Sequence, residues 1–288
     1  MSLKRKQLSH IRGSIACSPL STSKNEYSCL SNKELIDLAQ LWNKRHPDLK
    51  ITTMIPREIW KRFKYIFSKT CTNERCWLKS EMFKGGIGYD LLNDLETAYA
   101  PEAPEEWQTN PNTWLTSIDI DSVMSQYEEK YHCFRFIGPS PIDFDKKLTQ
   151  TECVWNALCN FNINKQGIKN KIGIIFNTDP HNKPGEHWVS LFIDITREHI
   201  VYFDSAGSDI PTEIHRLVEK IQKQTKHKYK FIKNFPIQHQ KKNTECGMYS
   251  LYFIIQMLKY GSYEPFISNK RITDADMERM RKKYFNTD

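Results

Sequence analysis

The sequence lacks any long apolar run. Nowhere in its 288 residues does an apolar stretch approach the roughly 20 residues that a membrane-spanning helix needs. The basic opening MSLKRKQLSHIRGS is not followed by the apolar core of a signal peptide. We therefore expect a protein that is not secreted, has no membrane span and works in a cytosolic setting.

The sequence also lacks a recognisable metal-binding pattern. Cys71 and Cys76, in KTCTNERCW, have no second pair of ligands nearby at zinc-like spacing, so a structural role is favoured over a metal site. No internal repeat is visible. The eight cysteines are scattered along a long chain, which is typical of reduced thiols and not of a secreted disulfide framework: Cys17, Cys29, Cys71, Cys76, Cys133, Cys153, Cys159 and Cys246. We expect neither a metal nor an organic cofactor.

Positive charge is in moderate excess. The 42 Lys and Arg residues against 34 Asp and Glu residues give a net charge of +8, which attracts acidic protein surfaces or nucleic acid. The densest run, KQTKHKYKFIK at 223–233, has a pattern that usually forms a solvated surface. An acidic partner or DNA is therefore an alternative partner beside a protein substrate.

The N-terminal part is predicted to be helical. Residues 1–25 are polar and rich in Ser and Lys, with no periodic apolar face, which predicts a flexible tail. Residues 26–108 are predicted to form a helical accessory domain. Ser31 and Glu34 form a capping box before an amphipathic run, and Pro56 opens a second helix with an aromatic stripe.

The C-terminal part, residues 109–288, is predicted to form a catalytic domain after a proline-rich connection at 100–113. Runs of β-branched and aromatic residues predict strands, and apolar residues spaced three or four positions apart predict helices. The strands are 171–177, 187–195, 199–204 and 229–235, and the helices are 117–132, 211–225 and 246–258. The pattern predicts an α+β fold with a mostly antiparallel central sheet flanked by helices.

Cys246 is the strongest candidate nucleophile. It lies where the polar loop HQKKNTE gives way to an apolar helix, and a thiolate at a helix N-terminus is favoured by the macrodipole and by free backbone N–H groups. Gly247 beside it allows close approach of a substrate backbone. The same Thr-Glu-Cys tripeptide ends at Cys153, but no glycine follows and no polar loop precedes it, so we interpret Cys153 as structural.

A base and an orienting group follow from a predicted hairpin. His187 opens one strand after the turn-rich segment DPHNKPGE, and Asp204 closes the next strand. Antiparallel pairing brings the start of the first strand beside the end of the second, so His187 and Asp204 are expected to be cross-strand neighbours. A thiol, a base and a group that orients the base are the parts that nucleophilic catalysis needs.

Three stretches carry a family resemblance: GEHWVSLFIDI, YFDSAG and QHQKKNTECGMYSLYF. They hold, in order, a His-Trp pair, an Asp seventeen residues after that His, a Gln six residues before a Cys, and a Cys-Gly pair. Together they resemble the Ulp-type proteases that cut SUMO and the adenovirus-type proteases. SCLSNKEL and FISNKRITDADM extend the likeness over most of residues 28–285 and resemble the polyprotein-processing proteases of the African swine fever virus type. The resemblance implies an Ulp-like fold with an added helical N-terminal domain.

The resemblance also implies roles for residues that local sequence leaves open. Gln240 matches the side-chain donor of the oxyanion hole, assisted by the backbone N–H of Cys246, and Asn243 is the fallback donor. Trp188 and Trp114 match two tryptophans that form a narrow tunnel over a glycine-rich tail, although plain core packing is an equally good interpretation of Trp114. Such a tunnel implies Gly-Gly or another small pair before the scissile bond.

We therefore expect a cysteine endopeptidase that cleaves viral structural polyproteins after a small Gly-containing motif during virion maturation, in the host cytoplasm and the virion of a large DNA virus. Its triad is predicted to be Cys246, His187 and Asp204, acting through an acyl-enzyme. Three alternatives stay open. They are an isopeptidase that removes SUMO or ubiquitin from host proteins, an acyltransferase of the YopJ type, which the tryptophans fit poorly, and a basic scaffold that binds nucleic acid without catalysis.

Overall fold

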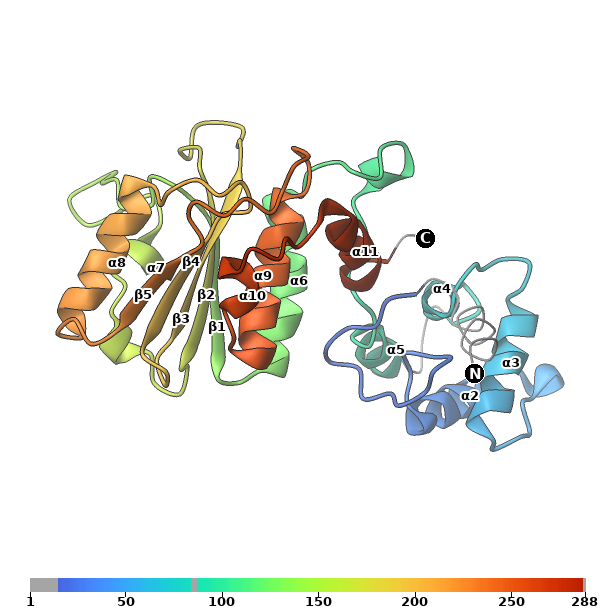
Figure 1. Cartoon of the computed structure of the whole chain (residues 1–288). Helices are drawn as coiled ribbons and strands as arrows, with labels where there is room; N and C mark the ends of the chain where they lie inside the picture. Colours follow the sequence, from blue (N-terminus) through green and yellow to red (C-terminus); the bar gives the residue numbers. More distant parts are fainter. Residues whose placement is uncertain (1–14, 84–87, 287–288) are drawn as a thin grey trace. The chain divides into compact units, whose positions relative to one another are not determined.

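The computed structural model describes residues 15–83 and 88–286, and Figure 1 shows their helices and strands. The chain folds into two compact units. One comprises the residues up to Ala103 together with Lys282–Asp288, and the other is Pro104–Arg281. Within the described ranges no helix is long and apolar enough to cross a membrane.

The unit boundaries differ in part from the predicted domains. The break after Ala103 falls within the predicted connection at 100–113. The last residues, however, return to the first unit, where the Asn286 amide donates hydrogen bonds to the carbonyls of Ala16 (3.0 Å) and Ala100 (2.9 Å). These contacts join chain ends far apart in sequence, so the local sequence of the C-terminus contains no sign of them.

The first unit is helical, as expected. The Ser31 hydroxyl accepts a hydrogen bond from the Glu34 N–H, and the Glu34 carboxylate accepts one from the Ser31 N–H, so the predicted capping box is present. Pro56 is the first residue of the next long helix. The helices are α2 (Asn32–Arg45), η1 (Pro47–Leu49), α3 (Pro56–Ile66), α4 (Glu74–Lys79) and α5 (Tyr89–Glu96). Their buried aromatic side chains form one cluster: Trp42, Trp60, Phe63, Phe67, Trp77 and Phe83.

Part of the predicted flexible tail packs onto this unit. Residues 1–14 of that tail lie outside the described residues, but residues 15–25 are held in place. Cys17 is bonded to Cys29, and the Ser23 hydroxyl lies 2.9 Å from two backbone carbonyls of the following turn. The absence of an apolar period was misleading here because a disulfide and side-chain bonds to the backbone, not an apolar face, fix the segment.

The cysteines also differ from the expectation of reduced thiols. The structure has three disulfides, and Cys133 and Cys246 are its free cysteines: the bonded pairs are Cys17–Cys29, Cys71–Cys76 and Cys153–Cys159. Each pair is separated by 12 residues or fewer. Local turns therefore bring the partners together, and cysteine spacing across the whole chain does not reveal this. No group of three or more His, Cys, Asp or Glu side chains in the described ranges is arranged to hold a metal ion.

The second unit is built around a five-stranded sheet in the order β1-β2-β3-β4-β5. The pairings β2–β3 and β3–β4 are antiparallel, whereas β1–β2 and β4–β5 are parallel. The predicted α+β class is confirmed, but the sheet is mixed and not mostly antiparallel. Long crossovers, not tight turns, lead into β2 and β5, and these produce the parallel pairings. The strands are β1 (Phe134–Pro141), β2 (Lys171–Asn177), β3 (Trp188–Asp194), β4 (His199–Phe203) and β5 (Lys230–Lys233).

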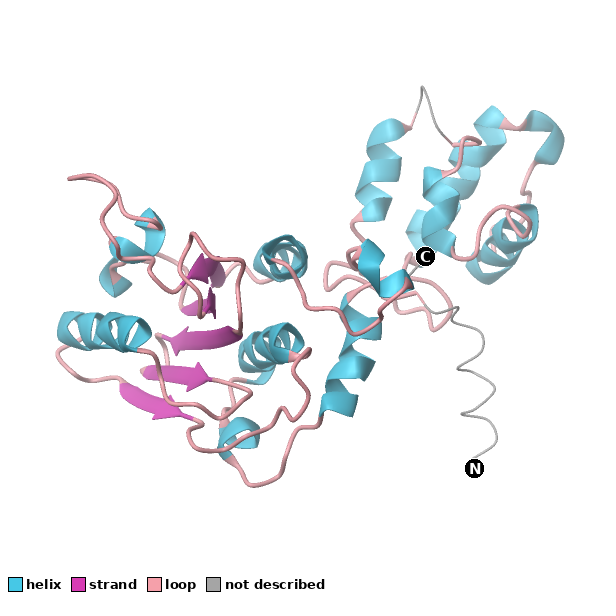
Figure 2. Ribbon diagram, turned by 90° about the horizontal axis from the view of Figure 1, so that it is seen from above, coloured by secondary structure: helices cyan, strands magenta, loops and turns pink. Residues whose placement is uncertain are grey.

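Helices cover both faces of this sheet (Figures 1 and 2). On one face Phe253 of a long helix stacks on Phe203 of β4, with ring centroids 5.0 Å apart. This face carries α6 (Ser117–Lys130) and α9 (Cys246–Tyr260), and the other carries α7 (Asn156–Cys159), η3 (Ile163–Lys165) and α8 (Thr212–Gln224). The predicted long helices match these bounds within two residues. The remaining elements are η2 (Glu105–Gln108), α10 (Glu264–Ile267) and α11 (Asp274–Tyr284).

Strands β3 and β4 form the predicted hairpin. Its register pairs Ser190 with Phe203, and Glu198 in the turn adopts a left-handed backbone conformation with φ of 54°. Every residue of β3 is buried. The start of β3 therefore lies beside the end of β4, which places His187 and Asp204 at the same end of the sheet.

Candidate active site

Cys246 is the first residue of α9, a helix buried on almost all sides. Its thiol is free and only 1% exposed. The first N–H groups of a helix have no partner within the helix, and they carry the positive end of its dipole. The sequence thus folds the thiol into the position where a thiolate is best stabilised.

His187 and Asp204 are in direct contact. The distance between His187 Nε2 and Asp204 Oδ1 is 2.6 Å, and the Asp204 side chain is 2% exposed. Since Nε2 faces the carboxylate, Nδ1 is the ring nitrogen left for the hydrogen bond between His187 and Cys246. The structure therefore brings together the three residues that the sequence singled out, from the loop before β3, the end of β4 and the start of α9.

The Asp204 carboxylate is held by further donors. Its Oδ1 accepts from the Ala206 N–H at 2.8 Å, and its Oδ2 accepts from the Ser208 N–H at 3.1 Å. Asn234 fixes the backbone of the same residue: its side-chain oxygen accepts from the Asp204 N–H at 2.9 Å, and its amide donates to the Asp204 carbonyl at 2.7 Å. A carboxylate with several fixed donors keeps its orientation, so it can hold the imidazole in one position.

The electrostatics of the site favour a charged His187. Burial lowers the pKa of this imidazole, but hydrogen bonds and charge interactions with Asp204 and Cys246 raise it from 6.5 to about 10. A histidine whose pKa is higher in the folded than in the unfolded protein stabilises the fold. This stabilisation is complete at pH values below the unfolded-state pKa and is lost as pH rises through the folded-state pKa. The imidazolium form therefore persists from neutral pH up to about pH 10.

Gln240 and Asn243, the two candidate oxyanion donors, lie in different environments. Gln240 is 5% exposed, and its Oε1 accepts a hydrogen bond of 2.7 Å from the Ser205 hydroxyl. Its backbone N–H also donates to the Ser205 carbonyl at 2.8 Å. Asn243 lies exposed in the loop. Because Ser205 occupies the amide oxygen, the Nε2 donors of Gln240 are left for another acceptor, which makes it the better placed donor of the two.

Trp188, Leu115 and Gly247 pack closely beside the thiol. The Trp188 indole donates to the Leu115 carbonyl at 3.0 Å. A Cβ on Gly247 would lie 3.0 Å from Leu115 Cβ and 3.3 Å from Trp188 Cδ1, so a side chain there would displace a neighbour. Trp114, next to Leu115, is 38% exposed, whereas Trp188 is buried. Trp114 is therefore not a core residue, and its ring is accessible.

A cleft of about 710 Å³ opens beside Trp188. Its wall combines apolar side chains with two carboxylates: Ile118, Pro139, Val154, Trp155, Asp121 and Asp179 are among the lining residues. Volumes of this order accommodate a drug-sized ligand. The cleft, which Trp188 lines but His187, Asp204 and Cys246 do not, thus offers space for an extended peptide segment.

Comparison with known proteins gives the family. Residues 111–288 match the model described as Ulp1 protease family, C-terminal catalytic domain. The chain belongs to the Ulp1 protease family. Membership of this family makes it a cysteine-type peptidase, and the fold expected from the resemblance is the one observed.

Viral relatives of the Ulp1 protease family cover three quarters or more of the chain. A thiol protease of Acanthamoeba polyphaga mimivirus is 31% identical over 294 residues, which are 93% of this chain and 92% of that protein. A cysteine protease of African swine fever virus is 32% identical over 231 residues, 75% of this chain and 83% of that protein. The crystal structure of the African swine fever virus protease has a TM-score of 0.67 at 26% identity and covers 95% of this chain and 98% of that chain. The similarity thus includes the helical N-terminal region.

Two supporting residues of this Ulp1-family site were not predicted. Ser205 orients Gln240, and Asn234 holds the backbone of Asp204. The serine directly follows Asp204, and a hydroxyl beside a site carboxylate is a signal that could have been noticed. Asn234 lies 30 residues away in sequence, at the end of β5, and no local pattern marks it.

Proposed function

We propose that this chain is a cysteine endopeptidase of a large DNA virus that cleaves structural polyproteins after a small Gly-containing motif during virion maturation. The observation that carries the proposal is the hydrogen-bonded pair of His187 and Asp204 (2.6 Å) beside Cys246 at the start of α9. The viral origin of the relatives supports the setting in the host cytoplasm and the virion.

The proposed reaction begins with the thiol proton of Cys246 on His187, since the raised pKa of His187 favours the imidazolium. The thiolate sulfur attacks the scissile carbonyl carbon, and a tetrahedral oxyanion forms. As the C–N bond breaks, His187 gives its proton to the leaving amine. Water, deprotonated by His187, then adds to the thioester carbonyl and forms a second tetrahedral intermediate. Its C–S bond breaks, which releases the product with a new carboxyl group and leaves the Cys246 thiolate beside the protonated His187.

Oxyanion stabilisation is proposed for Gln240 and the backbone N–H of Cys246. Preorganised donors of this kind contribute strongly because they need no reorientation when charge develops. The hydrogen bond from Ser205 supports this role, since it fixes which end of the Gln240 amide is free to donate. Asn243, in the exposed loop, is a weaker candidate.

The preference for small residues before the scissile bond is supported by the exposure of Trp114 and by its connection to Trp188. Trp114 is 38% exposed and lies next to Leu115, whose carbonyl accepts a hydrogen bond from the Trp188 indole at 3.0 Å. In a narrow passage between two such rings a substrate with branched side chains would clash, whereas Gly-Gly would not. We therefore assign substrate contact to Trp114, Trp188 and Gly247.

A second candidate function is removal of SUMO or ubiquitin from conjugates. It is favoured by the name of some African swine fever virus relatives, SUMO-1 cysteine protease. The chemistry at Cys246 would be the same, but the substrate would be a folded modifier. Cleavage of SUMO or ubiquitin conjugates at rates above those of Gly-Gly peptides would favour this function over polyprotein processing.

The test compares hydrolysis of peptides with Gly-Gly, Ala-Gly or Leu-Arg before a reporter by the parent and by Cys246→Ala. We expect cleavage of the small-residue peptides only, and none by Cys246→Ala. Cys133→Ala, which removes the other free thiol, is the matched control and should retain parent activity. A folded parent that cleaves none of the peptides and no conjugate, yet binds DNA in a salt-dependent way, would instead indicate a basic scaffold with an acidic partner.

A further inference from the structure

Arg281 is a buried arginine on α11 with three hydrogen-bond acceptors. It is 4% exposed. Its Nε donates to Glu245 Oε2 at 2.9 Å, its Nη1 to the Thr113 carbonyl at 3.0 Å, and its Nη2 to the Thr244 carbonyl at 3.2 Å. The guanidinium also lies 4.4 Å from the ring centroid of Trp107. A guanidinium held by so many fixed partners is a rigid connector and not a solvated charge.

Two of these contacts hold the residues directly before the nucleophile. Glu245 precedes Cys246 in sequence and is fully buried, and its carbonyl accepts the Tyr249 N–H at 2.9 Å, one of the hydrogen bonds that begin α9. Thr244 adds a hydrogen bond from its hydroxyl to the same carboxylate at 3.2 Å. Arg281 thus determines where the backbone enters the helix that carries the thiol.

The third contact of Arg281 is with Thr113, in the segment that carries Trp114. The Thr113 carbonyl is held by Arg281, and the Leu115 carbonyl is held by the Trp188 indole. Trp114 lies between these two anchored residues, and its ring is exposed. One side chain therefore ties the segment of a substrate-contact tryptophan to the segment of the nucleophile.

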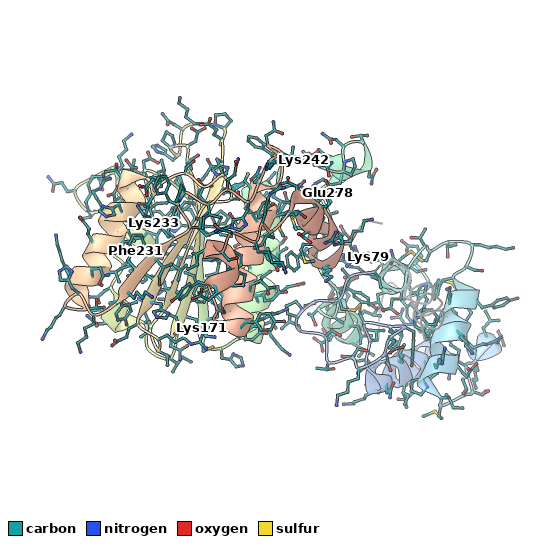
Figure 3. All side chains as sticks on the ribbon, viewed as in Figure 1. Lys79, Lys171, Phe231, Lys233, Lys242 and Glu278 are labelled. Atoms are coloured by element: carbon teal, nitrogen blue, oxygen red, sulfur yellow. A yellow bond between two sulfur atoms is a disulfide. The ribbon has the colours of Figure 1, made fainter. Side chains whose placement is uncertain are left out.

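The positive charge of Arg281 also balances the negative charge of the Glu245 carboxylate. Glu245 is the residue before Cys246, and a buried carboxylate in the vicinity of a thiol opposes formation of the thiolate where water is excluded. Arg281 supplies the balancing charge. Two further charged groups on the same loop and on α11 are paired: Lys242 with Glu278 at 2.6 Å and Asp274 with Arg271 at 2.7 Å. Lys242 and Glu278 are labelled in Figure 3.

We propose that Arg281 is a positioning residue for the active site, which sets the position of Cys246 and Trp114 and balances the charge of the buried Glu245, the residue directly before Cys246. This inference rests on the proposed roles of Cys246 and Trp114. It requires that Arg281 and Glu245 influence the reaction through charge as well as through folding, and that their influences have opposite signs.

The kinetic test uses Arg281→Met, Arg281→Lys and Glu245→Gln with the Gly-Gly peptide. For Arg281→Met we expect kcat/KM to fall about 10- to 100-fold, with kcat lowered and KM raised, because small misplacements of reacting groups have effects of this size. Arg281→Lys keeps the positive charge but lacks the planar guanidinium that reaches several acceptors at once. Its kcat/KM should fall about 10-fold, mostly through kcat. Arg279→Met on the same helix, whose arginine is exposed and pairs with Asp276, is the matched control and should stay within about twofold.

The second readout is alkylation of Cys246, measured by mass spectrometry against pH with the Cys133 peptide as internal reference. It needs no substrate. The acidic limb is the pH range in which the alkylation rate of Cys246 rises with pH. Arg281→Met leaves the negative charge of Glu245 unbalanced and should move this limb to higher pH. Glu245→Gln leaves a positive charge unbalanced and should move the limb to lower pH, so that the two variants differ by about one pH unit or more. A loss of packing alone would not separate the variants in this way.

The outcomes are distinct. Opposite shifts of the two limbs, together with the loss of kcat/KM, support the proposal. The proposal is overturned if the pH profiles of Cys246 alkylation coincide in Arg281→Met and Glu245→Gln, or if Arg281→Met has the kinetics of the parent, even when the parent is an active protease. If the parent cleaves no peptide, the proposed function fails, but the alkylation test still decides the role of Arg281. Circular dichroism establishes folding, and if Arg281→Met does not fold, Glu245→Gln must shift the limb to lower pH while Arg281→Lys leaves it in place.

Discussion

The two units bury carboxylates in opposite ways. In the helical unit Glu74 is 4% exposed and accepts hydrogen bonds from the Cys29 N–H (2.6 Å) and the Trp60 indole (2.7 Å), both neutral donors. In the second unit Asp204 is 2% exposed and faces His187, which can carry a positive charge. Burial raises the pKa of Glu74, whereas the contact with Asp204 raises the pKa of His187 to about 10.

This difference separates groups that pack from groups that react. A buried carboxylate with neutral donors is driven toward its uncharged form, because hydrogen bonds only partly replace hydration. A buried carboxylate against an imidazole stabilises a proton on that imidazole, and a thiol nucleophile needs a partner that takes its proton. We therefore expect substitution of Asp204 to act on activity and substitution of Glu74 to act on stability.

Asp204→Asn should show the largest effect. Asparagine keeps the shape but replaces one of the two acceptor oxygens by an NH2 group and removes the charge, so kcat/KM should fall by about 10²- to 10⁴-fold, the range for loss of an orienting carboxylate. Without that charge the pKa of His187 is raised less, and the alkaline limb of the pH profile should move down from about pH 10. The measurement is peptide hydrolysis between pH 5 and pH 11, and unchanged kcat/KM would remove Asp204 from the triad.

Gln240→Ala should rank next. Loss of one oxyanion donor lowers kcat by about 10²- to 10³-fold with little change in KM, because the interaction forms only as charge develops. Ser205→Ala is the matched variant: it leaves the amide in place but frees its orientation, and a loss of about 10-fold in kcat is expected. If Asn243→Ala lowers kcat more than Gln240→Ala, the assignment of the donor is wrong.

The sequence predicted those features that depend on neighbours along the chain. The contact of His187 with Asp204 follows from one hairpin, and the position of Cys246 follows from the change from polar loop to apolar helix. The link between Arg281 and Glu245 joins residues 36 apart through side chains alone, so no periodic pattern marks it. The mixed sheet was missed for a similar reason, since strand pairing across long connections is decided by packing in three dimensions.

Gly247→Ala tests the close packing next to the thiol. The added Cβ would meet Leu115 at 3.0 Å and Trp188 at 3.3 Å, so these neighbours must shift. We expect destabilisation of about 1–2 kcal/mol from overpacking, offset in part by the better helix propensity of alanine. Thermal unfolding measures the stability, and KM for the Gly-Gly peptide should rise. Unchanged KM would show that the substrate does not approach this backbone.

Glu74→Gln should have the smallest effect, and it should be confined to stability. Glutamine replaces one carboxylate oxygen, which accepts a hydrogen bond from the Cys29 N–H or from the Trp60 indole, by an NH2 donor, so at pH 4 the variant should be less stable than the parent by about 1–2 kcal/mol. The parent, however, carries a carboxyl with a raised pKa in the folded state, so its stability relative to the variant falls as pH rises above the unfolded value of 4.5. The deficit of the variant should therefore shrink between pH 4 and pH 7 in chemical unfolding followed by tryptophan fluorescence. A deficit that grows with pH would mean that Glu74 is stabilised as a carboxylate, and the contrast between the two units would not hold.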